Sequence, residues 1–153
     1  MTGELLDVGC GNKPYRALVP AARYTGLDID NAFTRRVGAA DVFYDGSAFP
    51  LPDAAFDAVL CSQVLEHVFT PEKFLGEIRR VLRPGGTLLL ANFLPDIQDV
   101  GYMETFMDWH LIYRTDREML ALTDALPFGD VARIRQFHDA LDNITFLEVT
   151  KRP

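Results

Sequence analysis

Seven short apolar runs, each followed by turn residues, constrain the fold of this chain more than any other feature. Their lengths and their β-branched and aromatic content are typical of strands. The runs are Glu4–Val8, Arg23–Ile29, Ala40–Tyr44, Phe56–Cys61, Gly86–Phe93, Val131–Phe137 and Ile144–Thr150. Because parallel strands need crossover connections, strands that alternate with helices predict a parallel sheet covered on both faces. A ligand of such a sheet binds near the carboxyl ends of its strands.

The first helical pattern is TPEKFLGEIRRVL, residues 70–82, between the fourth and fifth runs. Its apolar residues share one helix face, which indicates an amphipathic helix. Thr70 is a residue type that caps helices, and Pro71 fits the first helical position. Residues 83–86, Arg-Pro-Gly-Gly, cannot continue a helix and predict a sharp return to the next strand.

A second helical pattern follows Thr115, which is spaced from Glu118 as in a capping box. This helix should end near Pro127. The segment 94–113 before it has no clear period and contains Trp109. Because the segment is long, we expect it to form a lid or a substrate loop.

Composition limits the class of protein. The length of 153 residues and the 48% hydrophobic content predict one domain over residues 1–153. The net charge of -7 and the lack of any Lys/Arg run argue against nucleic acid as a partner. No apolar run approaches the roughly 18 residues of a membrane span and no leader pattern begins the chain, so we expect a soluble cytoplasmic protein. Cys10 and Cys61 fit neither a CxxC nor a zinc pattern, which indicates small buried thiols and no metal site.

A glycine-containing turn, Asp7–Gly11, follows the first predicted strand. Its glycines allow a tight turn and a close approach of the backbone to a ligand. The third glycine of a dinucleotide fingerprint would fall at Pro14, which counts against NAD. The second run ends in Asp28 and Ile29 and is followed by Asp30, and a carboxylate here can accept both ribose hydroxyls. Residues 45–47, Asp-Gly-Ser, can bond an exocyclic amine and a ring nitrogen, as adenine requires.

Four stretches occur in the order LLDVGCG, YTGLDID, DGSAFPLPDAAFDAVLCSQVLEHV and EIRRVLRPGGTLLL. Together they resemble the class I S-adenosylmethionine-dependent methyltransferases, strongly over Glu4–Phe93 and more weakly to the end. The chain is similar in particular to small bacterial members whose loop reads CGxxPY. DWHLIYRTDREML and NITFLEVTKRP loosely resemble bacterial enzymes that form methyl esters of hydroxylated fatty acids. The resemblance implies an α/β Rossmann-like sandwich with a seven-stranded, mostly parallel sheet of order 3-2-1-4-5-7-6, whose last strand is antiparallel.

The same resemblance implies S-adenosylmethionine as the cofactor. Its methionine portion would lie over Gly9 and Gly11, and Asp28 would bond its ribose hydroxyls. Asp7 would order the loop and the cofactor amine. Tyr15 either closes over the amino-acid end or serves as a packing aromatic. Acidic residues at this site suit the cationic sulfonium better than they suit a pyrophosphate.

The remaining cofactor contacts come from two other strand ends. By the resemblance, Asp45 would face the adenine amine, and Gly46 or Ser47 would supply the adjacent amide. Ser62 and Gln63, after the fourth strand, would line the floor beneath the sulfonium.

Methyl transfer is an in-line displacement, so a base matters only when the acceptor must be deprotonated. His67 either acts as base or acceptor-orienting group, or makes a structural hydrogen bond. His110, beside Asp108, either meets the substrate or is a solvated loop histidine. Arg114 either binds an acidic acceptor group or forms an ion pair on a solvated helix start.

The sequence thus predicts a methyltransferase that acts on a small-molecule acceptor. A catalytically inactive cofactor-binding module is the alternative, and an NAD-dependent oxidoreductase, which lacks an obvious Tyr/Lys pair, is less favoured. Relatives usually carry helices before the first strand, whereas Met1–Gly3 alone precedes it here. We therefore expect a trimmed form of a longer protein, a second subunit that covers the site, or cover by the segment 94–113. The apolar content of that segment favours burial over the pocket or in a homodimer.

Overall fold

The computed structural model describes residues 3–20, 23–95, 97, 100–106, 108, 110–127 and 129–153. The strands are β1 (Glu4–Val8), β2 (Arg23–Ile29), β3 (Val42–Tyr44), β4 (Phe56–Cys61), β5 (Leu82–Phe93), β6 (Val131–His138) and β7 (Ile144–Lys151). The helices are α1 (Ala32–Val37), α2 (Pro71–Val81), α3 (Val100–Phe106) and α4 (Asp116–Ala121), with short 3-10 helices η1 (Leu65–His67) and η2 (Leu122–Ala125). None of the helices in the described part of the chain has the length and apolarity needed to span a bilayer.

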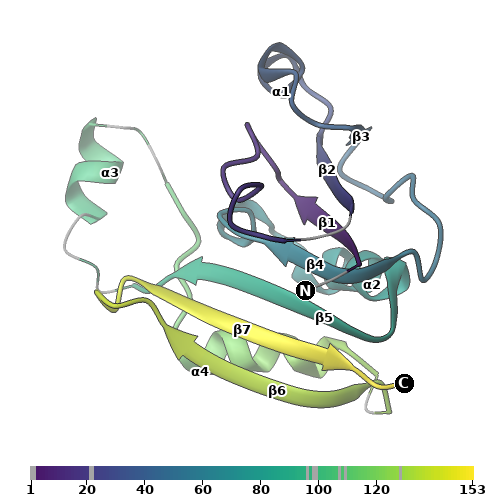
Figure 1. Ribbon diagram of the computed structural model, residues 1–153. Coiled ribbons are helices and arrows are strands. Elements are labelled where there is room, and N and C mark those ends of the chain that lie inside the picture. The colour runs from purple at the N-terminus through teal and green to yellow at the C-terminus, as the bar shows by residue number, and fades with distance from the viewer. Residues whose placement is uncertain are drawn as a thin grey trace.

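In the described part of the chain, the seven strands form one sheet of order β3-β2-β1-β4-β5-β7-β6 (Figure 1). The first five strands of this order pair in parallel, whereas β7 pairs antiparallel with both β5 and β6. This topology confirms the predicted fold, including the antiparallel last strand. The carboxyl ends of β1, β2, β4 and β5 consequently meet at one edge of the sheet, where ligands of such sheets bind.

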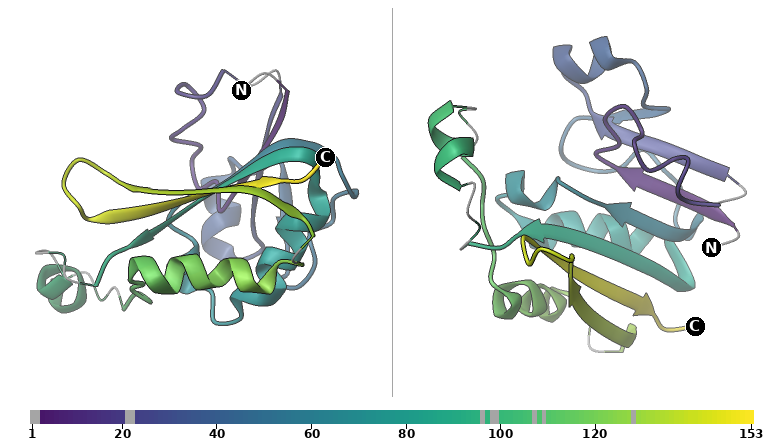
Figure 2. Two further views of the ribbon diagram at one scale, coloured as in Figure 1. Left: turned by 90° about the horizontal axis from the view of Figure 1, so that it is seen from below. Right: turned by 60° about the vertical axis from the view of Figure 1, so that its left-hand side comes forward.

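The main core lies between one face of the sheet and the helices α2, α4 and η2 (Figure 2). Alternate strand residues such as Leu6, Leu90 and Leu147 are fully buried there against α2 and α4. The predicted amphipathic helix is confirmed, because its apolar stripe is buried through Phe74, Leu75, Ile78 and Val81.

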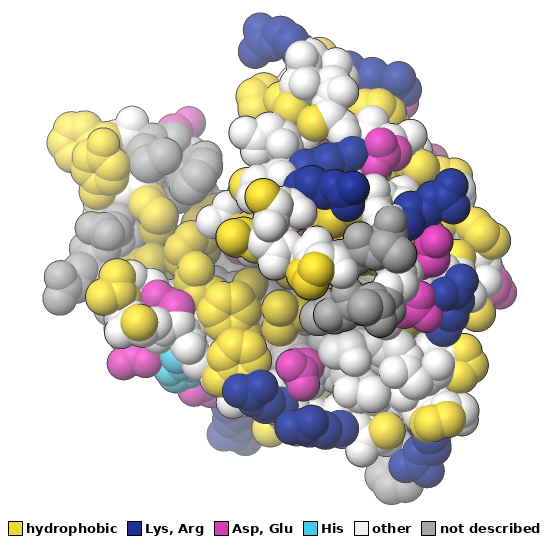
Figure 3. All heavy atoms as spheres, in the orientation of Figure 1, with side chains coloured by type: hydrophobic (Ala, Val, Ile, Leu, Met, Phe, Trp, Pro, Cys, Tyr) yellow, Lys and Arg dark blue, Asp and Glu magenta, His cyan; other side chains and the backbone are white. Residues whose placement is uncertain are grey.

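The opposite face of the sheet is covered by fewer segments of the chain. Over β1, β2 and β4 a small cluster of Leu5, Tyr24 and Ala58 packs against Val19 from the turn-rich segment that joins β1 to β2. Over β5, β7 and β6, Figure 3 shows hydrophobic side chains gathered on the surface. Phe137 of β6 and Phe146 of β7 stack with ring centroids 5.2 Å apart.

Strand β5 begins earlier than its sequence predicts. Helix α2 ends at Val81 and β5 starts at Leu82, because residues 83–86 form an irregular extended stretch instead of a separate turn. The pairing with β4 shifts there, and Gly85 takes a φ of +75° that suits glycine. At the start of α2, Pro71 occupies the first turn as predicted, but the side chain of Thr70 makes no capping hydrogen bond among the described residues.

The segment 94–113 contains a helix that its sequence does not signal, α3. Met103 in α3 is buried, whereas Tyr102 and Phe106 are exposed. Trp109, which the sequence analysis singled out, lies outside the described residues. After this segment the predicted capping box is present: Glu118 N donates to Thr115 Oγ1 (3.3 Å) and Thr115 N donates to a Glu118 carboxylate oxygen (2.8 Å).

Candidate functional site

A cavity of about 400 Å³ opens at the carboxyl edge of the sheet. Its walls come from the loop after β1, the end of β2, helix α1, the end of β3 and the segment around η1. The described residues that line it are Gly9, Gly11, Asp28, Ile29, Phe33, Thr34, Val37, Tyr44, Gln63, Val64, His67 and Val68. The cavity therefore lies where the predicted topology requires a ligand site.

The glycine loop forms one wall of the cavity, and both glycines have positive φ, +69° for Gly9 and +49° for Gly11. A Cβ on Gly9 would lie 2.1 Å from Val64 Cγ2, so the close approach of these two segments needs glycine. A Cβ on Gly11 would meet nothing within 4 Å. The amide of Gly9 donates to Leu27 O (2.8 Å), which holds the loop against β2.

Asp28 joins this loop to the end of β2. Its Oδ2 accepts a hydrogen bond from Gly11 N (3.0 Å) and its Oδ1 accepts one from Ile29 N (2.8 Å). The residue is only 8% exposed but lines the cavity. Because each carboxylate oxygen has two lone pairs, Asp28 keeps acceptor capacity for the hydroxyls of a ligand.

Asp7 lies in β1, two residues before Gly9 of the glycine loop. It is buried and accepts a hydrogen bond from Tyr24 Oη. Burial raises the pKa of Asp7 to about 6, although the hydrogen bond from Tyr24 acts in the opposite direction. Asp7 is not among the described residues that line the cavity, and its side chain bonds Tyr24 on β2 instead.

The predicted adenine-binding turn, 45–47, lies beside the cavity. Asp45 is exposed, and its Oδ1 accepts a hydrogen bond from Ser47 N (3.0 Å). Hydrogen bonds from Ser47 hold the pKa of this carboxyl below its usual value. A Cβ on Gly46 would contact Ile29 Cδ1 at 3.7 Å, so the turn borders the cavity wall without being part of the described lining.

On the other side, Gln63 and His67 line the cavity, and His67 is exposed at its rim. Ser62 Oγ and Tyr15 Oη are 3.1 Å apart and hydrogen-bonded, which ties the loop after β1 to the end of β4. The structure does not bring His110 to this cavity. Its Nε2 lies 3.2 Å from Asp108 Oδ1 on the surface.

Both interpretations of Arg114 from the sequence are wrong in this structure. The residue is 8% exposed and donates to the carbonyl oxygen of Leu65 (2.8 Å) and to Asn92 Oδ1 (2.9 Å). Its guanidinium thus donates to internal acceptors, and it forms no surface ion pair among the residues that the structure describes.

Sequence reasoning also missed helix α1, which adds Phe33, Thr34 and Val37 to the cavity wall. A signal was present, because Asn31 and Thr34 have the spacing of a capping box. Asn31 Oδ1 accepts hydrogen bonds from Phe33 N (2.9 Å) and Thr34 N (3.0 Å).

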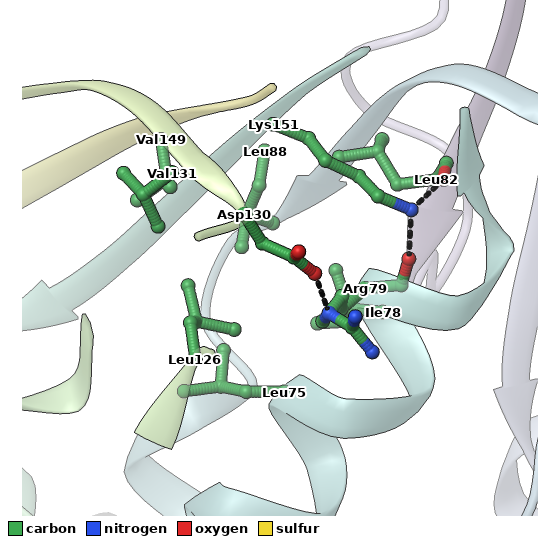
Figure 4. A pocket seen from close by; sticks show the side chains of 10 residues that line it. All are labelled: Leu75, Ile78, Arg79, Leu82, Leu88, Leu126, Asp130, Val131, Val149 and Lys151. Atoms are coloured by element: carbon green, nitrogen blue, oxygen red, sulfur yellow. Dashed lines mark hydrogen bonds and ion pairs between the residues drawn. The ribbon is translucent and has the colours of Figure 1, made fainter. Parts of the chain in front are cut away.

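A second hollow, of about 20 Å³, is lined by residues of α2, the β5, β6 and β7 strands and Leu126 after η2 (Figure 4). Its lining is mostly aliphatic, and Lys151 Nζ donates to the carbonyls of Arg79 (3.0 Å) and Leu82 (2.7 Å) at the end of α2. The hollow has room for about one water molecule, so we regard it as a packing feature. The two cysteines, Cys10 and Cys61, are buried as expected, and burial raises the pKa of Cys10 to about 11.

Comparison with known proteins adds a family match. A family model described as a methyltransferase domain matches residues 6–90, more than half of the chain. The chain is 39% identical over 96 residues to a Mycolicibacterium smegmatis protein named as a probable S-adenosylmethionine-dependent methyltransferase, covering 58% of this chain and 37% of that protein. It is 39% identical over 105 residues to a fatty-acid O-methyltransferase of the same organism, covering 60% and 38% of the two chains.

The chain therefore spans little more than a third of the length of these curated relatives. Further matching relatives are named for acceptors as different as a sterol and a tRNA. Among solved structures, a Haloferax volcanii methyltransferase in complex with the activator Trm112 has a TM-score of 0.72 at 19% identity, covering 98% of this chain and 83% of that chain. This likeness shows the fold alone.

Proposed function

Because the chain belongs to the methyltransferase-domain family of class I S-adenosylmethionine-dependent enzymes, we propose that it transfers a methyl group from this cofactor to a small-molecule acceptor. The observation that carries the proposal is the position of Asp28 beside Gly11 in the carboxyl-edge cavity. A volume of about 400 Å³ is in the range of small-molecule sites, so the cavity fits a nucleoside cofactor.

In this proposal the adenosine half lies between β2, α1 and β3, where Ile29, Phe33, Val37 and Tyr44 offer apolar surface. Asp28 accepts the ribose hydroxyls, and the turn 45–47 lies near the adenine edge. The methionine half lies over the open side of Gly11. The bound cofactor supplies an electrophilic methyl group on a sulfonium.

The protein's own task is then alignment of the acceptor. His67 at the rim of the cavity is the proposed base or acceptor-orienting group, and a role for His110 stays a prediction. Replacement of a general base lowers the rate by about 10²–10⁴-fold, so His67→Ala should reduce transfer and leave cofactor affinity unchanged. His138→Ala is the matched control, because His138 bonds Asp116 on α4.

The charge distribution supports a small acceptor over a nucleic acid. The net charge is -7, and two cations on segments near the cavity are already paired: Lys13 with Asp41 (2.7 Å) and Arg35 with Asp30 (2.7 Å). A polyanion would need cations that are available to its phosphates.

The test has two steps. Titration calorimetry with S-adenosylhomocysteine should show binding, and a labelled-methyl assay should then transfer label into small-molecule pools but not into tRNA. Absence of binding would overturn the proposal as a whole. Label in tRNA alone would overturn the proposed small-molecule acceptor but would leave the proposed cofactor in place.

A further inference from the structure

Two buried polar residues lie beside the wall of the cavity, outside the lining itself. Asn92 near the end of β5 is 1% exposed, and Arg114 at the end of the segment that follows β5 is 8% exposed. Arg114 Nη1 donates to Leu65 O (2.8 Å) and Asn92 Oδ1 (2.9 Å), and its Nη2 donates to Val68 O (3.3 Å). We call Asn92 and Arg114 with these carbonyls the Arg114 clamp.

The Arg114 clamp holds residues 110–114, the returning arm by which the segment 94–113 rejoins the core. Asn92 Nδ2 donates to Ile112 O (3.0 Å), and Arg114 N donates to Phe93 O (3.1 Å). Ile112 N in turn donates to Glu66 O in η1 (2.9 Å). The returning arm is therefore attached both to the end of β5 and to η1.

The Arg114 clamp also binds the cavity wall at backbone carbonyls before and after His67 in the chain. The carbonyls that Arg114 holds belong to Leu65 and Val68, and both His67 and Val68 line the cavity. A planar guanidinium can serve several acceptors in fixed directions, which a lysine ammonium cannot do as well. Arg114 thus links the wall of the cavity to the segment 94–113 through two side-chain hydrogen bonds, beside the backbone hydrogen bond from Ile112 N to Glu66 O.

We infer that Arg114 is a positioning residue. Cofactor bound against η1 fixes the Leu65 and Val68 carbonyls, and through the Arg114 clamp it also reduces the motion of residues 110–114, where the segment 94–113 returns to the core. The segment 94–113, which we expect to contact the acceptor, would then be ordered only when the cofactor is bound. This inference rests on the proposed function, because it requires the cofactor to bind in the carboxyl-edge cavity.

Hydrogen exchange measured by mass spectrometry, with and without S-adenosylhomocysteine, tests the coupling. In the wild type the cofactor should slow exchange at residues 63–68 and at residues 110–114, by about fivefold or more if the coupling has the usual strength. In Arg114→Lys, which keeps the charge, the slowing at 63–68 should persist and the slowing at 110–114 should decrease, because only the backbone hydrogen bond from Ile112 N to Glu66 O still joins the two segments. Arg117→Gln, an exposed arginine on α4, is the matched control and should behave like the wild type.

A second variant keeps the test decisive if Arg114→Lys does not fold. Asn92→Asp retains an oxygen acceptor for Arg114 but removes the Nδ2 donor to Ile112 O, so it should also reduce the slowing at 110–114. Slowing at 110–114 that stays at the wild-type level in either folded variant would overturn the inference alone. Failure of the wild type to bind S-adenosylhomocysteine would overturn the proposed function and the inference with it.

Discussion

Replacement of Glu66 by glutamine should stabilise the protein in alkaline solution. Glu66 is 2% exposed, and its Oε2 has no hydrogen-bond partner among the described residues. Burial raises the pKa of Glu66 from 4.5 to about 7, although the charge of Arg114 acts in the opposite direction. The folded protein therefore holds this proton more tightly than the unfolded chain does. Stability from this group is fully present below pH 4.5 and is lost as the pH rises through about 7.

The magnitude follows from the change in pKa. Each unit of change in pKa corresponds to 1.36 kcal/mol, so ionisation of Glu66 above pH 7 costs the folded state about 3 kcal/mol at most. Glutamine has nearly the same shape and cannot ionise, so Glu66→Gln should avoid this cost. The variant should match the wild type near pH 4.5 and gain up to about 3 kcal/mol at pH 8.

Urea denaturation followed by circular dichroism at pH 4.5 and pH 8 measures the effect as a change in the free energy of unfolding. Glu77→Gln is the matched control, because the pKa of Glu77 is lowered by hydrogen bonds from Arg80. That variant should lose stability at pH 8. If Glu66→Gln gains no more at pH 8 than at pH 4.5, the carboxylate is not buried as described.

Three further predictions concern the glycine loop and its acidic partners. Asp28→Ala should weaken S-adenosylmethionine binding by about 1.5–3 kcal/mol in calorimetry, the worth of charge-assisted hydrogen bonds, and unchanged affinity in a folded variant would refute the ribose assignment. Gly9→Ala should lower affinity because its Cβ meets Val64 Cγ2 at 2.1 Å, and Val64→Ala in the same chain should restore part of it; a second substitution without effect contradicts the steric reason. Because a cationic ligand favours an ionised carboxyl, affinity should fall below about pH 6, the pKa of Asp7, and Asp7→Asn should remove this dependence; an unchanged pH profile in that variant would exclude Asp7 as its source.

The sheet could be predicted from the sequence because its signals are local and repeated. Each strand is a short apolar run between turn residues, and the order followed from the family resemblance. Helix α1 gave no such signal. Each of its residues is at least partly exposed, so no apolar stripe reveals it, and only the cap formed by Asn31 and Thr34 marks its start. The early start of β5 was missed for another reason. Leu82 pairs with Phe56 and Thr87 with Ala58, so β4 is paired on both sides of residues 83–86, which on their own favour a turn.

The two halves of the site differ in the same way. The cofactor side depends on contiguous motifs, since the glycine loop and Asp28 each follow a strand directly and can be found by position. The proposed acceptor side depends on contacts between distant segments, because Arg114 donates to carbonyls 46 and 49 positions earlier in the chain. The position of Arg114 next to a helix cap predicts a solvated side chain, and no local sequence signal indicates that η1 will cover it. Under the proposed function, methyl transfer needs alignment more than a fixed base, so residues on this side would act by how they hold the backbone. Such residues become recognisable only when the fold brings their acceptors together.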